Sequence, residues 1–258
     1  MCVAGSVLGI TQLHDVVYII CDKSSTIFSF NVTTHQRLTD IDVEDLRSPR
    51  DIVACEQMSQ LYLADYKSVW RVSPDGADTK LWLPRSPSNT FRPLTLSVTS
   101  AGLLVASYNT KQLAQFDSGG DELRRVQLPR YMEPHHAVES PTGTFVVSHN
   151  NTQLRRCGIG EVSAGGKVLR QFTGSHLRSR WSSYVAVDSQ GRVFVTDFDS
   201  RRTRIMLLDA QLRLRRVLVE EHQLNYKPPY RLCYREQSGQ LLVAVDDKAA
   251  MFDLIHCT

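Results

Sequence analysis

Short runs rich in aliphatic residues recur along the chain at nearly regular intervals. Six of them share this form, and their last residues are separated by 43, 43, 41, 48 and 48 positions. The runs are segments 18–22, 61–65, 104–108, 145–149, 193–197 and 241–245. A repeat of about 40–50 residues with strand-like content is typical of the four-stranded blades of β-propellers. The pattern therefore predicts six blades.

Each unit has the same internal order. In the fifth, a β-rich run at 184–188 leads into the turn Ser189-Gln190-Gly191 and then into the aliphatic run. A third run follows at 205–208, and a fourth at 212–215 alternates Leu with Arg. Alternation with a period of two indicates strands, and no long window has helical periodicity. We expect an all-β chain: one domain over residues 1–258, a six-bladed propeller with four-stranded antiparallel blades. A β-sandwich with coincidental spacing is the alternative.

The sixth unit is shorter than the others. After Val245 only one more strand fits, near 249–255, whereas the first unit begins near Val7. A propeller can close when one terminus supplies a missing outer strand, because this pairs an open sheet edge. We predict that Met1–Gly5 lies against the last blade.

The fifth unit carries a resemblance to a known repeat. It has the order of apolar run, Gly191, strand, Asp197, Arg204-Ile205 and a closing Leu208-Asp209, which is similar to the NHL repeat. The second unit matches in part and the others keep only the strand order. The chain thus resembles the propeller ends of tripartite-motif NHL proteins. The RING, B-box and coiled-coil segments of that family are absent from this sequence, so its ubiquitin-ligase activity is not carried over.

Composition adds limits on compartment and class. No apolar stretch reaches the ~18 residues of a membrane span, and the first residues lack a basic segment typical of a signal peptide. We therefore expect a cytoplasmic protein, monomeric in isolation, with no membrane partner. The cysteines show no metal-binding or disulfide spacing, so buried thiols are expected. They are Cys2, Cys21, Cys55, Cys157, Cys233 and Cys257.

Charge is spread unevenly along the chain. Residues 155–216 hold 13 basic and 5 acidic side chains, whereas the rest holds 17 basic and 22 acidic. Arginine outnumbers lysine 23 to 7. Arginine has a planar fork that suits phosphate and carboxylate groups, and a one-sided field attracts an anionic partner.

In a propeller, the loops between blades share one face with the loops between second and third strands. The inter-blade loops are rich in arginine and also contain aromatic residues such as Phe91 and Tyr131. This composition is typical of single-stranded nucleic acid binding and equally of protein interfaces. The residues that we predict to bind a ligand on this basic face are Arg50, Arg92, Arg178, Arg180, Trp181, Arg201 and Arg202.

A second group is predicted at the mouth of the central channel, where the first strand of each blade starts. It comprises His135, His136, Tyr230 and Arg231. Histidine, tyrosine and arginine there could perform acid–base chemistry or, with His149, hold a metal. His135 and His136 should point to opposite sides of their strand, so three ligands are not assembled. Arg204 is expected to pair with an Asp between blades.

No phosphate-binding glycine loop, GxSxG, HExxH or zinc-knuckle motif occurs. We predict a non-catalytic propeller without cofactor or metal, which binds single-stranded RNA or another anionic polymer. The alternatives are an interaction module for an acidic peptide or protein, and a metal-dependent lyase or hydrolase at the channel mouth.

Overall fold

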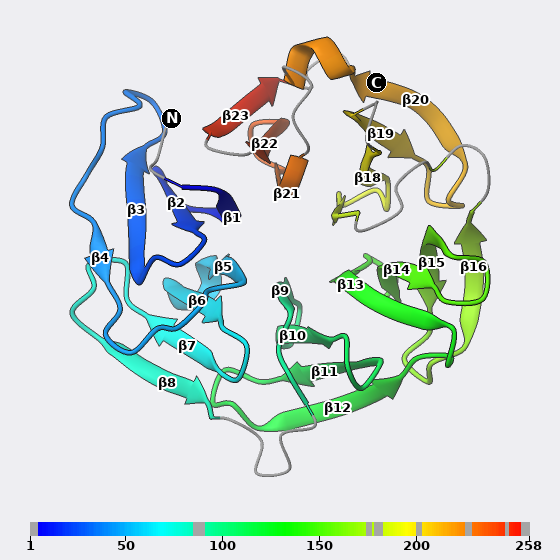
Figure 1. Ribbon diagram of the computed structural model, residues 1–258, viewed down its shortest axis with the longest axis horizontal. Coiled ribbons are helices and arrows are strands. Elements are labelled where there is room, and N and C mark those ends of the chain that lie inside the picture. The colour runs from blue at the N-terminus through cyan, green and yellow to red at the C-terminus, as the bar shows by residue number, and fades with distance from the viewer. Residues whose placement is uncertain are drawn as a thin grey trace.

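The structure is a computed structural model that describes residues 5–84, 91–173, 177, 183–199, 203–224, 229–245 and 248–253. It confirms the predicted all-β propeller: six antiparallel sheets surround a central axis, in chain order (Figure 1). Within each sheet, strands consecutive in sequence are hydrogen-bonded neighbours. We number the sheets as blades 1 to 6.

Blade 1 contains β1 (Val7–Leu13), β2 (Val16–Cys21), β3 (Thr26–Asn31) and β4 (Ile41–Asp42). Blade 2 contains β5 (Asp51–Cys55), β6 (Gln60–Ala64), β7 (Val69–Val72) and β8 (Thr79–Leu83), with the 3-10 turn η1 (Glu56–Met58) after β5. Blade 3 contains β9 (Thr95–Thr99), β10 (Gly102–Ser107), β11 (Gln112–Phe116) and β12 (Glu122–Gln127).

Blade 4 contains β13 (Met132–Glu139), β14 (Phe145–Asn151), β15 (Arg156–Val162) and β16 (Val168–Phe172). Blade 5 contains β17 (Val185–Val187), β18 (Val193–Phe198), β19 (Thr203–Leu208) and β20 (Leu214–Val219), and the 3-10 turn η2 (Glu221–Leu224) follows it. Blade 6 contains β21 (Pro229–Arg235), β22 (Gln240–Val245) and β23 (Lys248–Asp253).

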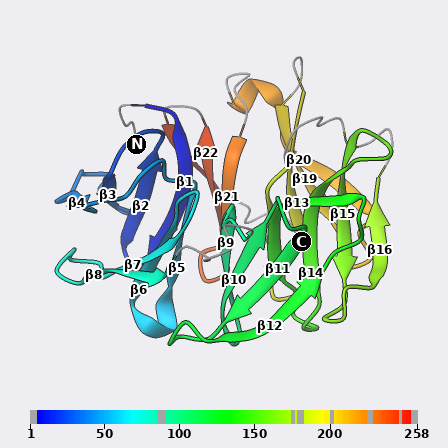
Figure 2. The ribbon, with the colours of Figure 1, turned by 60° about the horizontal axis from the view of Figure 1, so that its bottom comes forward.

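The strand pairing defines two faces. Inter-blade connections and the loops between second and third strands lie on one side, which we call the loop face. The turns between first and second strands lie on the opposite side, the turn face. Figure 2 shows the β5–β6 connection at the lower edge of the molecule and η2 at the upper edge. A site on the loop face is thus assembled from the starts of first strands and the ends of second strands.

The predicted turns have the expected backbone. In the Ser100-Ala101-Gly102 turn of blade 3, Gly102 has φ +141°, and a Cβ there would lie 2.2 Å from the carbonyl oxygen of Phe116. Only glycine fits such a position, since it has no side chain and tolerates positive φ. The hairpin geometry that the turn residues predicted is therefore confirmed here.

The core consists of packed interfaces between successive blades. Each buried cluster joins two neighbouring sheets, such as Leu63 of blade 2 with Ile20 of blade 1. The ring is closed in the same way, because Leu242 and Ala244 of blade 6 pack with Ile10 and Val17 of blade 1. Burial of such an aliphatic side chain contributes about 1.5–3 kcal/mol, so closure rests on sheet-to-sheet packing.

Blade 6 has three strands within the described residues, and β23 agrees with the single strand expected after Val245. The segment predicted to complete it, Met1–Gly5, lies outside the described residues except for Gly5. Closure by that segment stays a prediction.

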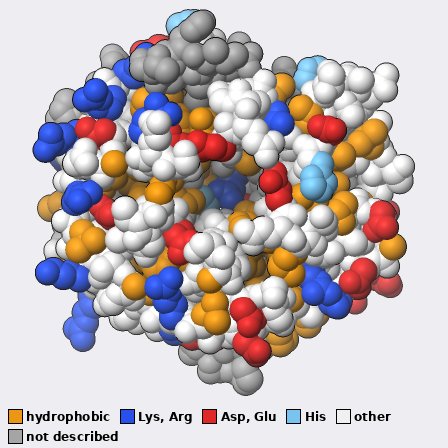
Figure 3. Space-filling model, turned by 180° about the vertical axis from the view of Figure 1, so that it is seen from behind, with side chains coloured by type: hydrophobic (Ala, Val, Ile, Leu, Met, Phe, Trp, Pro, Cys, Tyr) orange, Lys and Arg blue, Asp and Glu red, His pale blue; other side chains and the backbone are white. Residues whose placement is uncertain are grey.

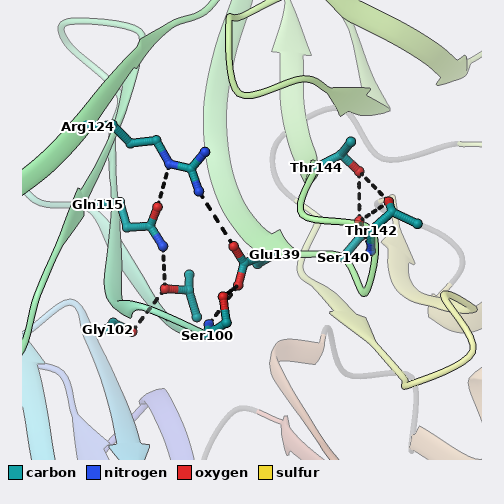
Figure 4. A network of polar contacts seen from close by, with 9 residues as sticks. Ser100, Gly102, Gln115, Arg124, Glu139, Ser140, Thr142 and Thr144 are labelled. Carbon is teal, nitrogen blue, oxygen red and sulfur yellow. Dashed lines mark hydrogen bonds and ion pairs between the residues drawn. The ribbon is translucent and has the colours of Figure 1, made fainter.

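Polar contacts also join the blades at the turn face (Figure 4). Glu139, at the end of β13, accepts hydrogen bonds from the backbone N–H and the hydroxyl of Ser100 in blade 3, at 2.7 and 2.8 Å. Arg124 Nη2 lies 3.7 Å from the other oxygen of Glu139. Glu236, directly after β21, likewise accepts hydrogen bonds from the backbone N–H and the hydroxyl of Ser189 in blade 5. A glutamate that ends a first strand thus holds the turn of the preceding blade.

Candidate functional site

Five of the six first strands meet in a buried polar network inside the channel. Arg231 of β21 is its centre: Nε lies 2.8 Å from Asp51 Oδ1 of β5, and Nη2 donates to the carbonyl of Leu96 in β9 at 2.9 Å. Its Nη1 contacts the ring of His136 from β13. The arginine is 4% exposed, so its charge depends on these partners.

Asp51 is fully buried and balances Arg231. Its carboxylate accepts the backbone N–H groups of Ile52 at 2.9 Å and Leu96 at 2.8 Å. Burial raises the pKa of Asp51, and the guanidinium of Arg231 opposes that rise. A buried pair of this kind costs desolvation energy, which its hydrogen bonds and mutual attraction offset.

His136 contributes a neutral ring to the network. Its Nδ1 accepts the N–H of Val185 from β17 at 3.4 Å, and its Nε2 lies 3.3 Å from the Leu96 carbonyl oxygen. Burial, followed by the charge of Arg231, lowers the pKa of His136 well below its ordinary value. The ring therefore joins blades 3, 4, 5 and 6 as a hydrogen-bonding group.

The structure brings together two of the four predicted channel residues, His136 and Arg231. His135 points away from them, as strand alternation predicted, and its ring centroid lies 6.3 Å from that of Tyr108. The side chain of Tyr230 lies outside the described residues. In the part of the chain that is described, no three His, Cys, Asp or Glu side chains are placed to share a metal ion. The network has the contacts of a structural tie across the channel.

Above this tie, the loop face carries Arg50, the residue before β5. The centre of its guanidinium lies 3.6 Å from the ring centroid of Tyr66, in the loop between β6 and β7. Partial burial lowers the pKa of Arg50, which the nearby Asp22 opposes. Arginine is charged at all physiological pH values, so the loop face holds a fixed, half-buried cation here.

Three successive blades present a large apolar side chain in the loop after the second strand. Tyr66, Tyr108 and Leu154 follow the second strands of blades 2, 3 and 4 and are 46%, 45% and 60% exposed. Exposed apolar groups in a row on one face mark an interaction surface more than scattered ones do. We call these three residues, with Arg50 and Arg92, the loop-face row.

The remaining predicted binding residues are only partly placed. Arg92 is exposed, and its backbone N–H is held by Ser107 Oγ and Asn109 Oδ1, each at 3.2 Å. The others lie outside the described residues: Arg178, Arg180, Trp181, Arg201 and Arg202. The predicted basic face is therefore represented here by Arg50 and Arg92.

One expectation from the sequence is wrong, and another is met in part. Phe91 is 7% exposed and belongs with Trp82 to the buried cluster between blades 2 and 3, because burial of its apolar ring between the two sheets is favourable. Arg204 pairs with Asp197 at 2.8 Å, but the two residues are opposite each other on β19 and β18 of one blade. The ion pair thus joins two strands within blade 5.

Sequence reasoning missed the exposed tyrosines and the role of Asp51. A signal for Tyr66 and Tyr108 exists, because each lies within two residues of the end of a second strand. The prediction relied instead on aromatic residues in the inter-blade loops. Asp51 stands beside Arg50 at the predicted channel end, but its contact with Arg231 joins residues 180 positions apart, which no local pattern reports.

The turn face differs from the loop face. Figure 3 shows it with a hollow at the middle, a basic side chain at the floor of the hollow and acidic side chains around the opening. A cavity of about 500 Å³ opens there, lined by residues including Gln12, Asp15, Glu56, Cys233 and Glu236.

The described cysteines are free thiols: Cys21, Cys55, Cys157 and Cys233. Cys2 and Cys257 lie outside the described residues. Within the described part, no helix is long and apolar enough to cross a membrane.

Comparison with known proteins shows the fold of the chain but not its family or activity. No family model matches the chain, and no curated protein matches it. Among solved structures, a catalytically inactive virginiamycin B lyase from Staphylococcus aureus with quinupristin has a TM-score of 0.71 and 12% identity, over 98% of this chain and 83% of that one. A streptogramin B lyase has a TM-score of 0.67 and 10% identity, over 97% and 95%. Hydrazine synthase of Kuenenia stuttgartiensis has a TM-score of 0.67 and 14% identity, over 95% and 75%. At these identities the chain shares a propeller architecture with enzymes, without a shown family.

Proposed function

We propose that the chain is a non-catalytic binding propeller whose loop face takes an anionic polymer, with single-stranded RNA as the partner. The observation that carries the proposal is the loop-face row, in which arginine stands beside exposed tyrosine. Such a surface holds single strands by contacts to phosphates and by stacking of bases on aromatic rings. The excess of basic residues over 155–216 also supports a negatively charged partner.

The channel supports a non-catalytic role. Asp51, His136 and Arg231 contact one another and neighbouring backbone groups, so they are engaged in the fold. General acid–base catalysis needs a group that can reach a substrate. The enzyme names among the structural neighbours support only the architecture at 10–14% identity. As part of this proposal, the chain is an NHL-type propeller, as the resemblance of blade 5 implies, and is located in the cytoplasm.

One observation favours a second candidate, an acidic peptide or protein. Leu154 is 60% exposed, and an aliphatic group contributes to a protein interface but offers no face for stacking a base. A peptide complex should depend on Leu154 and on the tyrosines, and should depend less on salt than an RNA complex does.

The test is binding of a random single-stranded RNA pool to the purified chain at low and at physiological salt. We expect selective enrichment that persists at physiological salt and an affinity that falls as salt rises, because neutralised phosphates release counterions. The double variant Arg178→Glu, Arg201→Glu should lose RNA binding with little change in melting temperature. Absence of binding by the wild-type chain, or unchanged affinity in that variant, would contradict the proposal.

A further inference from the structure

The loop that carries Tyr66 is held rigidly by one residue. Asp65 accepts the backbone N–H groups of Lys67 at 2.6 Å and Ser68 at 2.7 Å, and its other oxygen accepts Trp70 Nε1 at 3.1 Å. Its own N–H donates to the carbonyl of Ser68 at 3.0 Å. An Asp that closes a turn in this way fixes the backbone. Tyr66 therefore stands at the tip of an ordered loop.

Arg50 covers one face of the Tyr66 ring. The 3.6 Å distance from the guanidinium to the ring centroid leaves no room for another group between them. Since Tyr66 is nevertheless 46% exposed, we infer that its free surface includes the ring face opposite Arg50. An aromatic ring held at low conformational cost with one face open is suited to stack on a planar ligand.

The guanidinium of Arg50 has donors to spare. No side-chain hydrogen bond or ion pair of Arg50 is found among the described residues. Its Nε is buried, so the donors that a ligand can reach are those of Nη1 and Nη2. The carboxylate of Asp65 is engaged by its own loop, and that of Asp51 by Arg231. Exposed Asp22 lowers the local positive potential, whereas Lys67 and Arg92 on the same face raise it. An arginine with unused donors beside an open ring suits phosphate next to a planar base.

We propose that Arg50 and Tyr66 form a subsite for one nucleotide, whose base stacks on the open face of Tyr66 and whose phosphate accepts hydrogen bonds from Arg50. This inference rests on the proposed RNA-binding function and names the place where one unit of the strand binds. It requires both parts of the ligand. A nucleoside or a sugar phosphate alone makes half of the contacts.

The test is titration of the chain, with its tyrosine rings ¹³C-labelled, with adenosine 5′-monophosphate, with adenosine and with ribose 5-phosphate. At constant ionic strength, we expect the Tyr66 ring signals to shift saturably with the nucleotide. Adenosine and ribose 5-phosphate should each bind at least about tenfold more weakly than the nucleotide, in keeping with the energy of stacking one base. The Arg50→Gln variant should bind the nucleotide more weakly by the same factor. The Tyr66→Phe variant should bind it as tightly as the wild type does.

Leu81→Ala is the matched control, because Leu81 on β8 of the same blade is 46% exposed, as Tyr66 is, and lies outside the loop-face row. The control variant should bind the nucleotide with unchanged affinity, whereas the affinity of Tyr66→Ala should be at least about tenfold lower. Equal affinity in Tyr66→Ala and wild type, or equal affinity for nucleotide and ribose 5-phosphate, would overturn the subsite. If Tyr66→Ala also binds the RNA pool as the wild type does, the subsite is wrong while the proposed function stands. If the wild type fails to bind the pool, the proposed function is wrong.

Discussion

The two ends of the channel have opposite chemistry although the same strands form both. At the loop face, Arg50 precedes β5, and Arg231 lies near the start of β21. At the turn face, Glu56 follows β5, and β13 ends at Glu139. Every first strand runs from the loop face to the turn face, so β5, with Arg50 before it and Glu56 after it, has a basic residue at one face and an acidic residue at the other. The comparison indicates that an anionic partner should approach one face only.

The largest effect should come from breaking the buried network of Asp51, His136 and Arg231, which joins the blades across the channel. Arg231→Met leaves Asp51 buried without its counter-charge, and loss of one partner from a buried pair costs about 3–5 kcal/mol. Chemical denaturation should measure this loss of unfolding free energy. The double variant Asp51→Asn, Arg231→Met should recover part of it, because no unpaired charge remains. A single variant as stable as the wild type would show that the network is not a structural tie.

Acid should weaken the loop-face end of blade 4. His149 is fully buried, neither ring nitrogen has a side-chain or backbone partner within hydrogen-bond geometry among the described residues, and burial lowers its pKa to about 4 from an ordinary 6.5. The unfolded chain therefore binds a proton at a higher pH than the folded chain does. Stability should fall as the pH drops from about 6.5 to about 4, by up to about 3 kcal/mol.

Melting temperatures measured across this pH range check the effect of His149, with His149→Phe as the comparison. The variant should show a smaller fall between neutral and acidic pH. The ring centroid of Tyr131 lies 6.5 Å from that of His149, and the neighbouring, half-buried His135 also has a pKa lowered by burial, so part of the fall should persist. An identical pH profile in both proteins would contradict this assignment.

Charge reversal on the two faces sharpens the comparison directly. Arg92→Glu on the loop face should weaken RNA binding at physiological salt by about tenfold and reduce the salt slope by about 1 to 2. Glu56→Arg adds a positive charge of the same size on the turn face and should leave the slope unchanged. Filter binding at several salt concentrations measures both. Equal effects from the two variants would mean that RNA is attracted by net charge alone.

The smallest effect concerns the glutamates that hold the turn face. Glu139→Ala leaves the N–H and the hydroxyl of Ser100 without their acceptor and should cost about 1 kcal/mol, the typical net value of such a hydrogen bond. RNA affinity should not change, because the contact lies at the opposite end of the blade. A change in RNA affinity without a change in stability would contradict the separation of the two faces.

Local patterns in the sequence were enough for the fold. Aliphatic runs with polar turns such as Ser100-Ala101-Gly102 report burial and chain reversal within one hairpin, and their regular recurrence predicted six blades. The single strand β23 after Val245 was also predicted, from the few residues that follow Val245. Each of these features depends on residues that are close in sequence, where alternation and turn preferences act directly.

The candidate site was predictable only in part. His136 and Arg231 were assigned to the channel because first strands line it, and the structure places both there. Their shared partner Asp51 was not recognised, since the contact depends on how separate sheets are arranged around the axis. Phe91 and Tyr66 show the same limit, because both are aromatics near blade ends and only packing decides that one is buried and the other exposed.

The sequence by itself therefore determined the repeat, the number of blades, the class of fold and the uneven distribution of charge. Only the tertiary structure decided that Arg231 is neutralised inside the channel whereas Arg50 stays on the loop face with its donors unused. The physical reason is that periodicity records which side of a strand is buried. The partners of a charged side chain are set by strands from other blades, at sequence separations that carry no periodic signal.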